Sequence, residues 1–211
     1  MTGVSEEPLR TFLNTGFHNP ALDVVMAGLS SWAVWWPFAV VGGLGLMVAG
    51  GSRGRLAVLA ILLAIGISDG FVCRTLKELV QRPRPHEMQE GVRVVDLKKA
   101  SPRFLALAQP VNARVSEPPK HIRGGRSFPS SHAANCFALA TVLALSYRRG
   151  WVALVVAFAV AVSRVYTGSH WPTDVMAGAI IGILCGWGAV WGTRVVARRL
   201  IPGLFGSPKA A

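Results

Sequence analysis

Apolar segments separated by short polar links make up most of this chain of 211 residues. Four of the segments contain no Asp, Glu, Lys or Arg, and the second contains only Asp69. The five segments are residues 33–50, 56–73, 133–147, 151–163 and 175–192. A helix needs about 17–25 residues to cross a bilayer, so the third and fourth segments must borrow flanking residues. The pattern predicts at least five membrane-spanning helices.

A further helix is predicted before the first of these segments. Residues 19–31 place apolar side chains at helical spacing on one face and are too short to cross a membrane. We interpret them as an interfacial helix. We therefore expect an all-α integral membrane bundle of five to six helices, in one domain covering residues 1–211. Residues 1–32 are its interfacial N-terminal segment and residues 86–128 an extracytoplasmic loop.

Composition and charge support a membrane protein with a defined orientation. Hydrophobic residues make up 52% of the chain, charged residues 15%, and the mean hydropathy is +0.44. The net charge of +12 would suggest nucleic acid binding in a soluble chain. Here the basic links 52–55 and 147–150 and the tail after residue 192 lie on one side if the spans alternate, and the turn 167–173 has no Lys or Arg. The positive-inside rule places the basic side in the cytoplasm, so we expect an integral cytoplasmic membrane protein that does not bind nucleic acid.

Polar residues gather at the opposite ends of the same helices, in three separate stretches. The stretches are residues 77–85, 129–132 and 163–174. Together they supply three cations (Lys77, Arg84, Arg164), two histidines (His132, His170) and one carboxylate (Asp174). Guanidinium and ammonium groups complement a tetrahedral oxyanion. One histidine can attack phosphorus and another can protonate a leaving oxygen, so the stretches indicate phosphoryl transfer at a surface facing the periplasm or cell exterior.

Helix boundaries should bring these stretches together. The second helix should end near Gln81, because Pro83 disfavours helix in the residues before it. Ser130 or Ser131 suits the N-cap of the third helix, which would place backbone N–H groups next to the motif. Pro172 suits the first turn of the fifth helix. Four helix ends are then expected to meet and form a polar pocket.

In order and spacing, the three stretches resemble the signature of the type-2 phosphatidic acid phosphatase superfamily. That pattern is Lys, six residues, Arg-Pro; then Pro-Ser-Gly-His; then Ser-Arg, five residues, His, three residues, Asp. The match covers about half the chain and is complete except that Ser131 replaces the glycine.

The resemblance implies roles for the motif residues and a lipid phosphate or diphosphate in the bilayer as substrate. It makes His170 the nucleophile that becomes phosphohistidine, His132 the acid for the leaving group, and Asp174 the residue that orients His170. The residues that bind phosphate would be Lys77, Arg84, Ser130, Ser131 and Arg164. The resemblance also implies metal-free catalysis without a cofactor.

Several polar residues stay outside the predicted site. Arg82 could contact a second phosphate, but we prefer to interpret it as solvated. Asp69 could be functional or could pair with an inward-facing Arg or Lys. A small acidic and histidine cluster in the loop (His86, Glu87, Glu90) is interpreted as solvated rather than metal-binding. The loop itself is either a lid over the headgroup or a solvated connector with a short packed helix at residues 104–108.

Three classes of function remain open from the sequence. The first is a membrane phosphatase acting on undecaprenyl diphosphate, phosphatidic acid, phosphatidylglycerophosphate or a lipid A phosphate. The second is vanadate-dependent haloperoxidase chemistry, which the apolar spans oppose because such relatives are soluble. The third is a catalytically silent membrane scaffold or transporter, which the intact motif histidines oppose. The sequence leaves the oligomeric state open.

Overall fold

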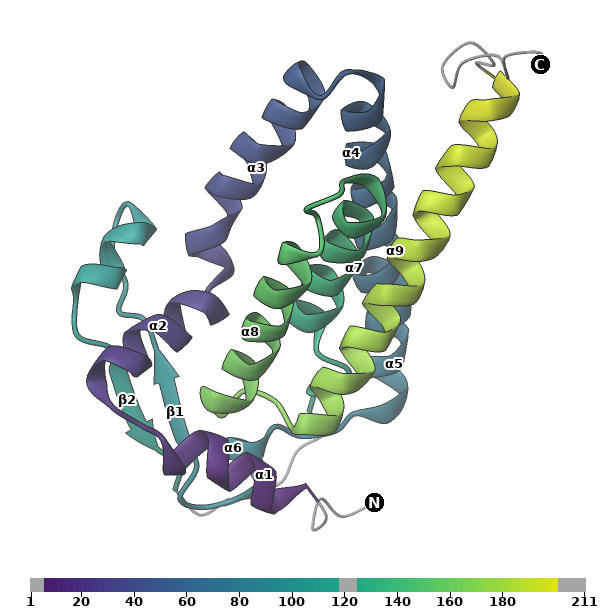
Figure 1. Cartoon of the computed structure of the whole chain (residues 1–211). Coiled ribbons are helices and arrows are strands. Elements are labelled where there is room, and N and C mark those ends of the chain that lie inside the picture. Colours follow the sequence, from purple (N-terminus) through teal and green to yellow (C-terminus); the bar gives the residue numbers. More distant parts are fainter. Residues whose placement is uncertain (1–5, 118–124, 201–211) are drawn as a thin grey trace.

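Helices form most of the computed structural model, which describes residues 6–117 and 125–200 (Figure 1). Its elements in chain order are α1 (Glu7–Thr11), η2 (Phe12–Gly16), α2 (Pro20–Ser30), α3 (Trp32–Ala49), α4 (Gly51–Ile65), η3 (Gly66–Cys73), α5 (Arg74–Val80), α6 (Pro85–Met88), β1 (Arg93–Asp96), η4 (Arg103–Ala108), β2 (Asn112–Val115), α7 (Ser131–Ser146), α8 (Val152–Tyr166) and α9 (Pro172–Leu200). The predicted interfacial helix at residues 19–31 corresponds to α2.

Within the described residues, three segments are long and apolar enough to cross a membrane: α3, Gly51–Met88 and α9. Only 6% of the apolar window of α3 is buried in the protein, which suits a helix that faces lipid. Helices α7 and α8 are apolar but shorter than 18 residues. The structure therefore supports a helical membrane bundle, and the predicted count of five to six spans stays a prediction.

The second apolar helix ends where the sequence predicts. Helix α5 stops at Val80, and Gln81 takes a left-handed conformation with φ 47° while its N–H donates to the carbonyl oxygen of Lys77. The prolines that follow cannot continue the helix. The chain therefore turns away from the bundle directly after the turn that holds Lys77.

Close packing of α7 on α9 brings the starts of these two helices together. A Cβ atom at Gly178 would lie 2.4 Å from the carbonyl oxygen of Ser130, and one at Gly182 would lie 2.2 Å from that of Ala134. Small residues one helical turn apart allow such an approach of two backbones. At the end of this contact where both helices begin, the Ser130 N–H donates to the backbone oxygen of Asp174 over 3.0 Å.

We expect Gly182→Ala to lower the free energy of unfolding by about 1–3 kcal/mol, because its methyl group would overlap the Ala134 carbonyl oxygen and push the two helices apart. Thermal unfolding of the purified protein in detergent measures this effect. Gly188→Ala on the same helix is the matched control, since a Cβ there meets nothing within 4 Å. Equal unfolding midpoints for the two variants would contradict the close-packing argument.

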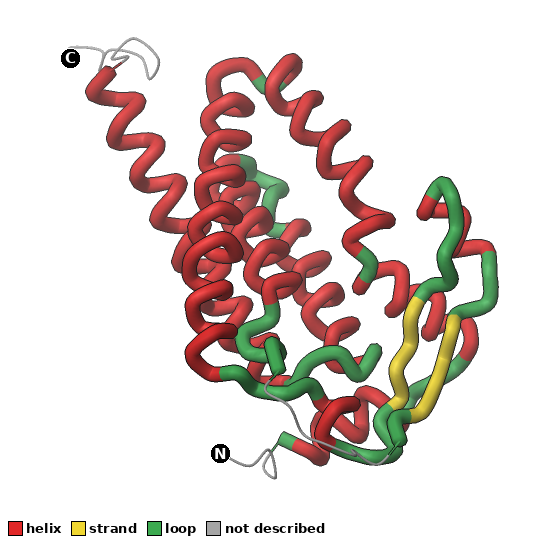
Figure 2. The backbone as a smooth tube through the Cα atoms, turned by 180° about the vertical axis from the view of Figure 1, so that it is seen from behind, coloured by secondary structure: helices red, strands yellow, loops and turns green. Residues whose placement is uncertain are grey.

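The loop between α6 and α7 contains a two-stranded antiparallel sheet, so the all-α prediction is wrong for this segment. Strand β1 pairs with β2, with Arg93 opposite Val115 and Asp96 opposite Asn112. The two strands and the segment between them (residues 93–115) form a hairpin, which lies beside the helices on the side of α2 and α3 (Figure 2). Each strand is only four residues long, which leaves too short an alternation to detect.

The hairpin is packed on the side of β1 and η4, whereas the residues of β2 are exposed. Val95, Leu97 and Ala106 are buried in one cluster with Ala27 of α2 and Val34 of α3. The apolar patch at residues 104–108 forms η4, as the connector interpretation expected. Residues 118–124 of this loop lie outside the described residues.

Different turns and short elements lie at the two ends of the bundle (Figure 1). The α8–α9 turn, α1, α6 and the hairpin lie at one end. The α3–α4 turn, the α7–α8 turn and the end of α9 lie toward the other. The motif stretches therefore share one end of the molecule, and the short basic links lie toward the opposite end.

Candidate active site

The turn between α8 and α9 positions His170. Gly168 has a φ of +69°, and a Cβ there would lie 2.4 Å from the Arg93 carbonyl oxygen, so this position requires glycine. The N–H groups of Ser169 and His170 both donate to the carbonyl oxygen of Arg164 over 3.1 Å. The His170 side chain is only 4% exposed. The turn therefore holds the imidazole in a fixed place at the end of the bundle.

One edge of the His170 ring faces the predicted partner. Nδ1 lies 3.6 Å from Oδ2 of Asp174 and 3.4 Å from Oγ of Ser127. This contact leaves Nε2 as the ring nitrogen available to a substrate, and a carboxylate on the far nitrogen fixes the tautomer.

The environment of His170 favours its neutral form. Burial, together with the Arg164 and Arg84 charges, lowers the pKa of His170 to about 4, although Asp174 acts in the opposite direction. A lowered pKa means that the ring stays unprotonated at neutral pH. An unprotonated Nε2 carries the lone pair that a nucleophile needs.

Asp174 is fully buried and is held by several donors. Its Oδ2 accepts hydrogen bonds from Ser127 Oγ over 2.5 Å and from the Trp171 N–H over 3.0 Å. Its Oδ1 accepts one from Arg82 over 2.8 Å. A carboxylate fixed on both oxygens can orient a neighbouring imidazole. Ser127 could not be predicted from the sequence, because it belongs to no motif stretch.

Arg82 is part of this network, so its interpretation as a solvated side chain is wrong. The side chain is 19% exposed and donates to Asp174, to Thr173 Oγ1 and to Glu6. Its guanidinium also lies over the Trp171 ring, 5.0 Å from the centroid. Glu6 in turn accepts from the Thr173 N–H over 2.9 Å at the start of α9. No local pattern connects Glu6 with residue 82, because they are 76 residues apart.

A second network ties the hairpin to the His170 turn. Asn14 is fully buried, and its amide donates to the backbone oxygens of Arg93 and Tyr166 over 2.8 and 2.7 Å. Asp23 forms an ion pair with Arg93 and accepts a hydrogen bond from the Tyr166 hydroxyl over 2.6 Å. His86 also braces this turn, with Nδ1 3.0 Å from the Gly168 oxygen, rather than being solvated as we had interpreted it.

The predicted phosphate-binding residues gather around the start of α7. Lys77 donates a hydrogen bond to the Ser131 hydroxyl, so the residue that replaces the family's glycine contacts the lysine. Ser130 is the N-cap, yet its buried hydroxyl has no hydrogen-bond partner among the described residues. Free donors at a helix start suit an anion. His132 follows directly in the first turn of α7 and is half-buried.

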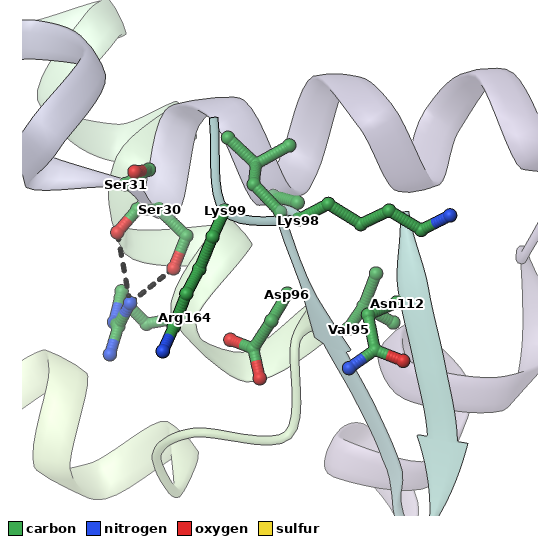
Figure 3. A pocket seen from close by; sticks show the side chains of 10 residues that line it. Ser30, Ser31, Val95, Asp96, Lys98, Lys99, Asn112 and Arg164 are labelled. Atoms are coloured by element: carbon green, nitrogen blue, oxygen red, sulfur yellow. Dashed lines mark hydrogen bonds between the residues drawn. The ribbon is translucent and has the colours of Figure 1, made fainter. Parts of the chain in front are cut away.

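The two arginines of the predicted site differ in their surroundings. Arg84 is half-buried at the N-cap of α6, and its charge acts on His170. Arg164 is 8% exposed, and its Nη1 donates to the carbonyl oxygen of Ser30 over 3.1 Å and to the Ser30 hydroxyl. Figure 3 shows this guanidinium beside a pocket between α2, β1 and α8.

Asp69 has a polar partner of a kind that we did not anticipate. Asn135 on α7 donates to Oδ2 of Asp69 over 3.2 Å and accepts from Ser68. The Asp69 carboxylate is therefore hydrogen-bonded to the Asn135 amide, rather than paired with an inward-facing Arg or Lys. Since residue 135 lies one turn beyond His132, this contact fixes η3 against α7 beneath the site.

Comparison with known proteins agrees with this geometry. The family model described as "PAP2 superfamily" matches residues 57–198. The lipid A 4'-phosphatase of Bacteroides thetaiotaomicron is 32% identical over 183 residues, which are 85% of this chain and 72% of the relative. The putative undecaprenyl-diphosphatase YbjG of Escherichia coli is 37% identical over 67 residues, which are 30% of this chain and 33% of the relative.

A solved structure extends the similarity to the fold. The crystal structure of Aquifex aeolicus LpxE has a TM-score of 0.61 and 27% sequence identity, and the match covers 88% of this chain and 94% of that one. The motifs, their convergence and these matches agree: the chain belongs to the PAP2 superfamily and is a lipid phosphatase that hydrolyses phosphoric monoesters.

Proposed function

We propose that this membrane phosphatase dephosphorylates a phosphorylated glycolipid of the lipid A type, without a metal ion, through a phosphohistidine on His170. The observation that carries the mechanism is the burial of His170 beside Asp174: burial keeps the imidazole neutral, and the carboxylate fixes its tautomer. The relatives whose names refer to lipid A support the substrate class, because one of them matches 85% of this chain. An isoprenyl diphosphate is the second candidate, supported by a match over 30% of the chain.

The proposed reaction has two steps. In the first, Nε2 of His170 attacks phosphorus, the bond from phosphorus to the lipid oxygen breaks, and His132 gives its proton to that oxygen. Lys77, Arg84 and Arg164 offset the charge on the phosphoryl oxygens. In the second, His132 takes a proton from water, whose oxygen attacks phosphorus. The P–N bond then breaks, and inorganic phosphate leaves a neutral His170.

Phosphate release by the purified protein in detergent tests this proposal. We expect activity on a lipid A-type phosphate that is unchanged by EDTA and inhibited by vanadate, which resembles the trigonal-bipyramidal state. A membrane-anchored substrate arrives oriented, so kcat/KM should exceed that for p-nitrophenyl phosphate. Loss of activity in EDTA that magnesium restores would exclude the histidine mechanism. Equal efficiency on the soluble ester would indicate a general phosphatase.

We further propose that the site faces the periplasm or cell exterior across the cytoplasmic membrane. The charge asymmetry supports this orientation, since Arg53, Arg148 and Arg149 lie in short links away from the site. A cysteine at Arg114 in the hairpin should react with an impermeant thiol reagent added to intact cells, and one at Arg149 should not. Gly150 is unsuitable for this substitution, because a Cβ would lie 2.0 Å from the Leu143 oxygen. The reverse labelling pattern would place the site in the cytoplasm.

A further inference from the structure

A pocket of about 520 Å³ opens beside the site, between the end of α2, strand β1 and the end of α8 (Figure 3). Its polar lining comes mainly from Ser30, Asp96, Lys99, Asn112 and Arg164. The hairpin supplies three of these residues, and the family signature includes only Arg164. The pocket is therefore formed largely by parts of the chain to which the phosphatase motifs assign no role.

The base of the pocket contains a cation with unused hydrogen-bonding capacity. Arg164 is 8% exposed and is anchored through Nη1 on Ser30. Its buried Nε has no hydrogen-bond partner among the described residues. A buried donor without a partner is unfavourable unless a ligand satisfies it. The guanidinium is thus positioned to contact a bound anion.

A second cation lies beside it. Figure 3 shows the Lys99 side chain extending alongside Arg164, with the two charged groups at the same side of the pocket. Lys98 extends the other way, so that its amino group lies away from Arg164. No acidic group lies within ion-pair distance of Lys99 in the part of the chain that the structure describes. Asp96 lines the same pocket and its charge acts on Arg164, but the two neighbouring cations together outweigh this one carboxylate and favour an anionic ligand.

The pocket also offers groups suited to hydroxyls. Asp96 and Asn112 are opposite each other in the hairpin and are exposed, and both line the pocket. A carboxylate accepts hydrogen bonds from sugar hydroxyl groups, and an amide both donates to them and accepts from them. The hairpin is held against the His170 turn, because the Val95 N–H donates to the Thr167 oxygen over 3.4 Å. A ligand in the pocket would therefore lie at a fixed position relative to the nucleophile.

We propose that this pocket binds the glycan headgroup of the substrate, with Lys99 contacting a second phosphate on it, an inference that rests on the proposed function. The alternative is that Lys99 contacts the second phosphate of a compact diphosphate, which carries the same negative charge. The pocket volume favours the glycan, since it lies in the range of sites that enclose whole small ligands. Asp96 also favours the glycan, because its carboxylate would repel a small polyanion but can accept from hydroxyls.

The test compares wild type with Lys99→Ala in detergent on three lipids. These are a bisphosphorylated disaccharide lipid, the same lipid without the phosphate remote from the cleaved bond, and a polyprenyl diphosphate. On the first lipid we expect Lys99→Ala to raise KM roughly five- to tenfold, with kcat changed less than about twofold, the effect of losing one partly exposed charged contact. On the second lipid both constants should match those of wild type.

Two charge-matched variants on the same segment serve as controls. Arg114→Ala removes an exposed cation of β2 that is not part of the pocket, and it should leave both constants unchanged. Lys98→Ala should have a smaller effect than Lys99→Ala, because its amino group lies away from Arg164. Equal thermal unfolding midpoints would show that the variants share the wild-type fold.

The outcomes separate this inference from the proposed function. Two results would overturn the headgroup pocket alone, provided that wild type cleaves the glycolipids. In one, Lys99→Ala has the same kinetic constants as Lys98→Ala. In the other, Lys99→Ala loses the same factor of activity on both glycolipids. If Lys99→Ala loses activity only on the polyprenyl diphosphate, Lys99 contacts the second phosphate of a diphosphate, and the glycan proposal is also overturned. Wild type that releases phosphate from none of the three lipids overturns the proposed function, and this inference with it.

Discussion

Replacement of His170 by alanine should lower kcat by a factor on the order of 10⁴ or more, because the proposed reaction passes through a covalent bond to this side chain. Phosphate release from the lipid substrate measures the loss. In wild type, rapid acid-free quenching with ³²P-labelled substrate should trap acid-labile phosphate on the protein. His132→Ala should let this label accumulate for substrates with good leaving groups. The label should be missing from the His170 variant.

Controls are needed because His170 is buried, so its replacement also removes packing contacts. His170→Gln fills more of the space than alanine and should be equally inactive, with a thermal unfolding midpoint near that of wild type. His18→Ala removes an exposed histidine of the N-terminal segment and should retain full activity. More than a few per cent of wild-type activity in a folded His170 variant would contradict a covalent mechanism.

Arg82→Ala should lower kcat/KM by about 10–100-fold, although this side chain is predicted to act only through Asp174. The variant removes a charged hydrogen bond that holds the Asp174 carboxylate in place, and such a bond contributes about 1.5–3 kcal/mol. Arg74→Ala is the matched control, because it removes an exposed i,i+4 ion pair with Glu78 on α5 and should be neutral.

The pH profile distinguishes a positioning role from a purely structural one. The acid limb of kcat/KM in wild type should lie near the His170 pKa of about 4, since protonation removes the nucleophilic lone pair. Without the Arg82 cation, Asp174 exerts a stronger negative field on His170. The pKa then rises, and activity is lost at a higher pH as the pH falls. An acid limb that stays in place would contradict this coupling.

The helix ends and the motif residues could be predicted because each depends on local chemistry. Proline and serine positions determine where α5 stops and where α7 and α9 begin. The apolar segments determine which ends face the same way. Together they were sufficient to predict that Lys77, Ser131 and the His170 turn meet at one end of the bundle.

The missed features all depend on contacts between distant parts of the chain. The β1–β2 sheet is stabilised by burial against α2 and α3 rather than by its own short alternation. Arg82 was interpreted as solvated because its partners are distant in the sequence. Its partners come from opposite ends of the chain, and only tertiary structure brings Glu6 and Asp174 to the same guanidinium.

The contact between Glu6 and α9 also has a consequence for biosynthesis. Glu6 is translated well before its partner Thr173, which follows 167 residues later. The network around Asp174 can therefore close only after every membrane helix before α9 has been synthesised. It also requires the segment before α2 to reside on the same side of the membrane as the His170 turn. The complete site therefore forms only once the start of α9 is in place, and the helices before it carry the other motif residues without the arrangement that makes them reactive.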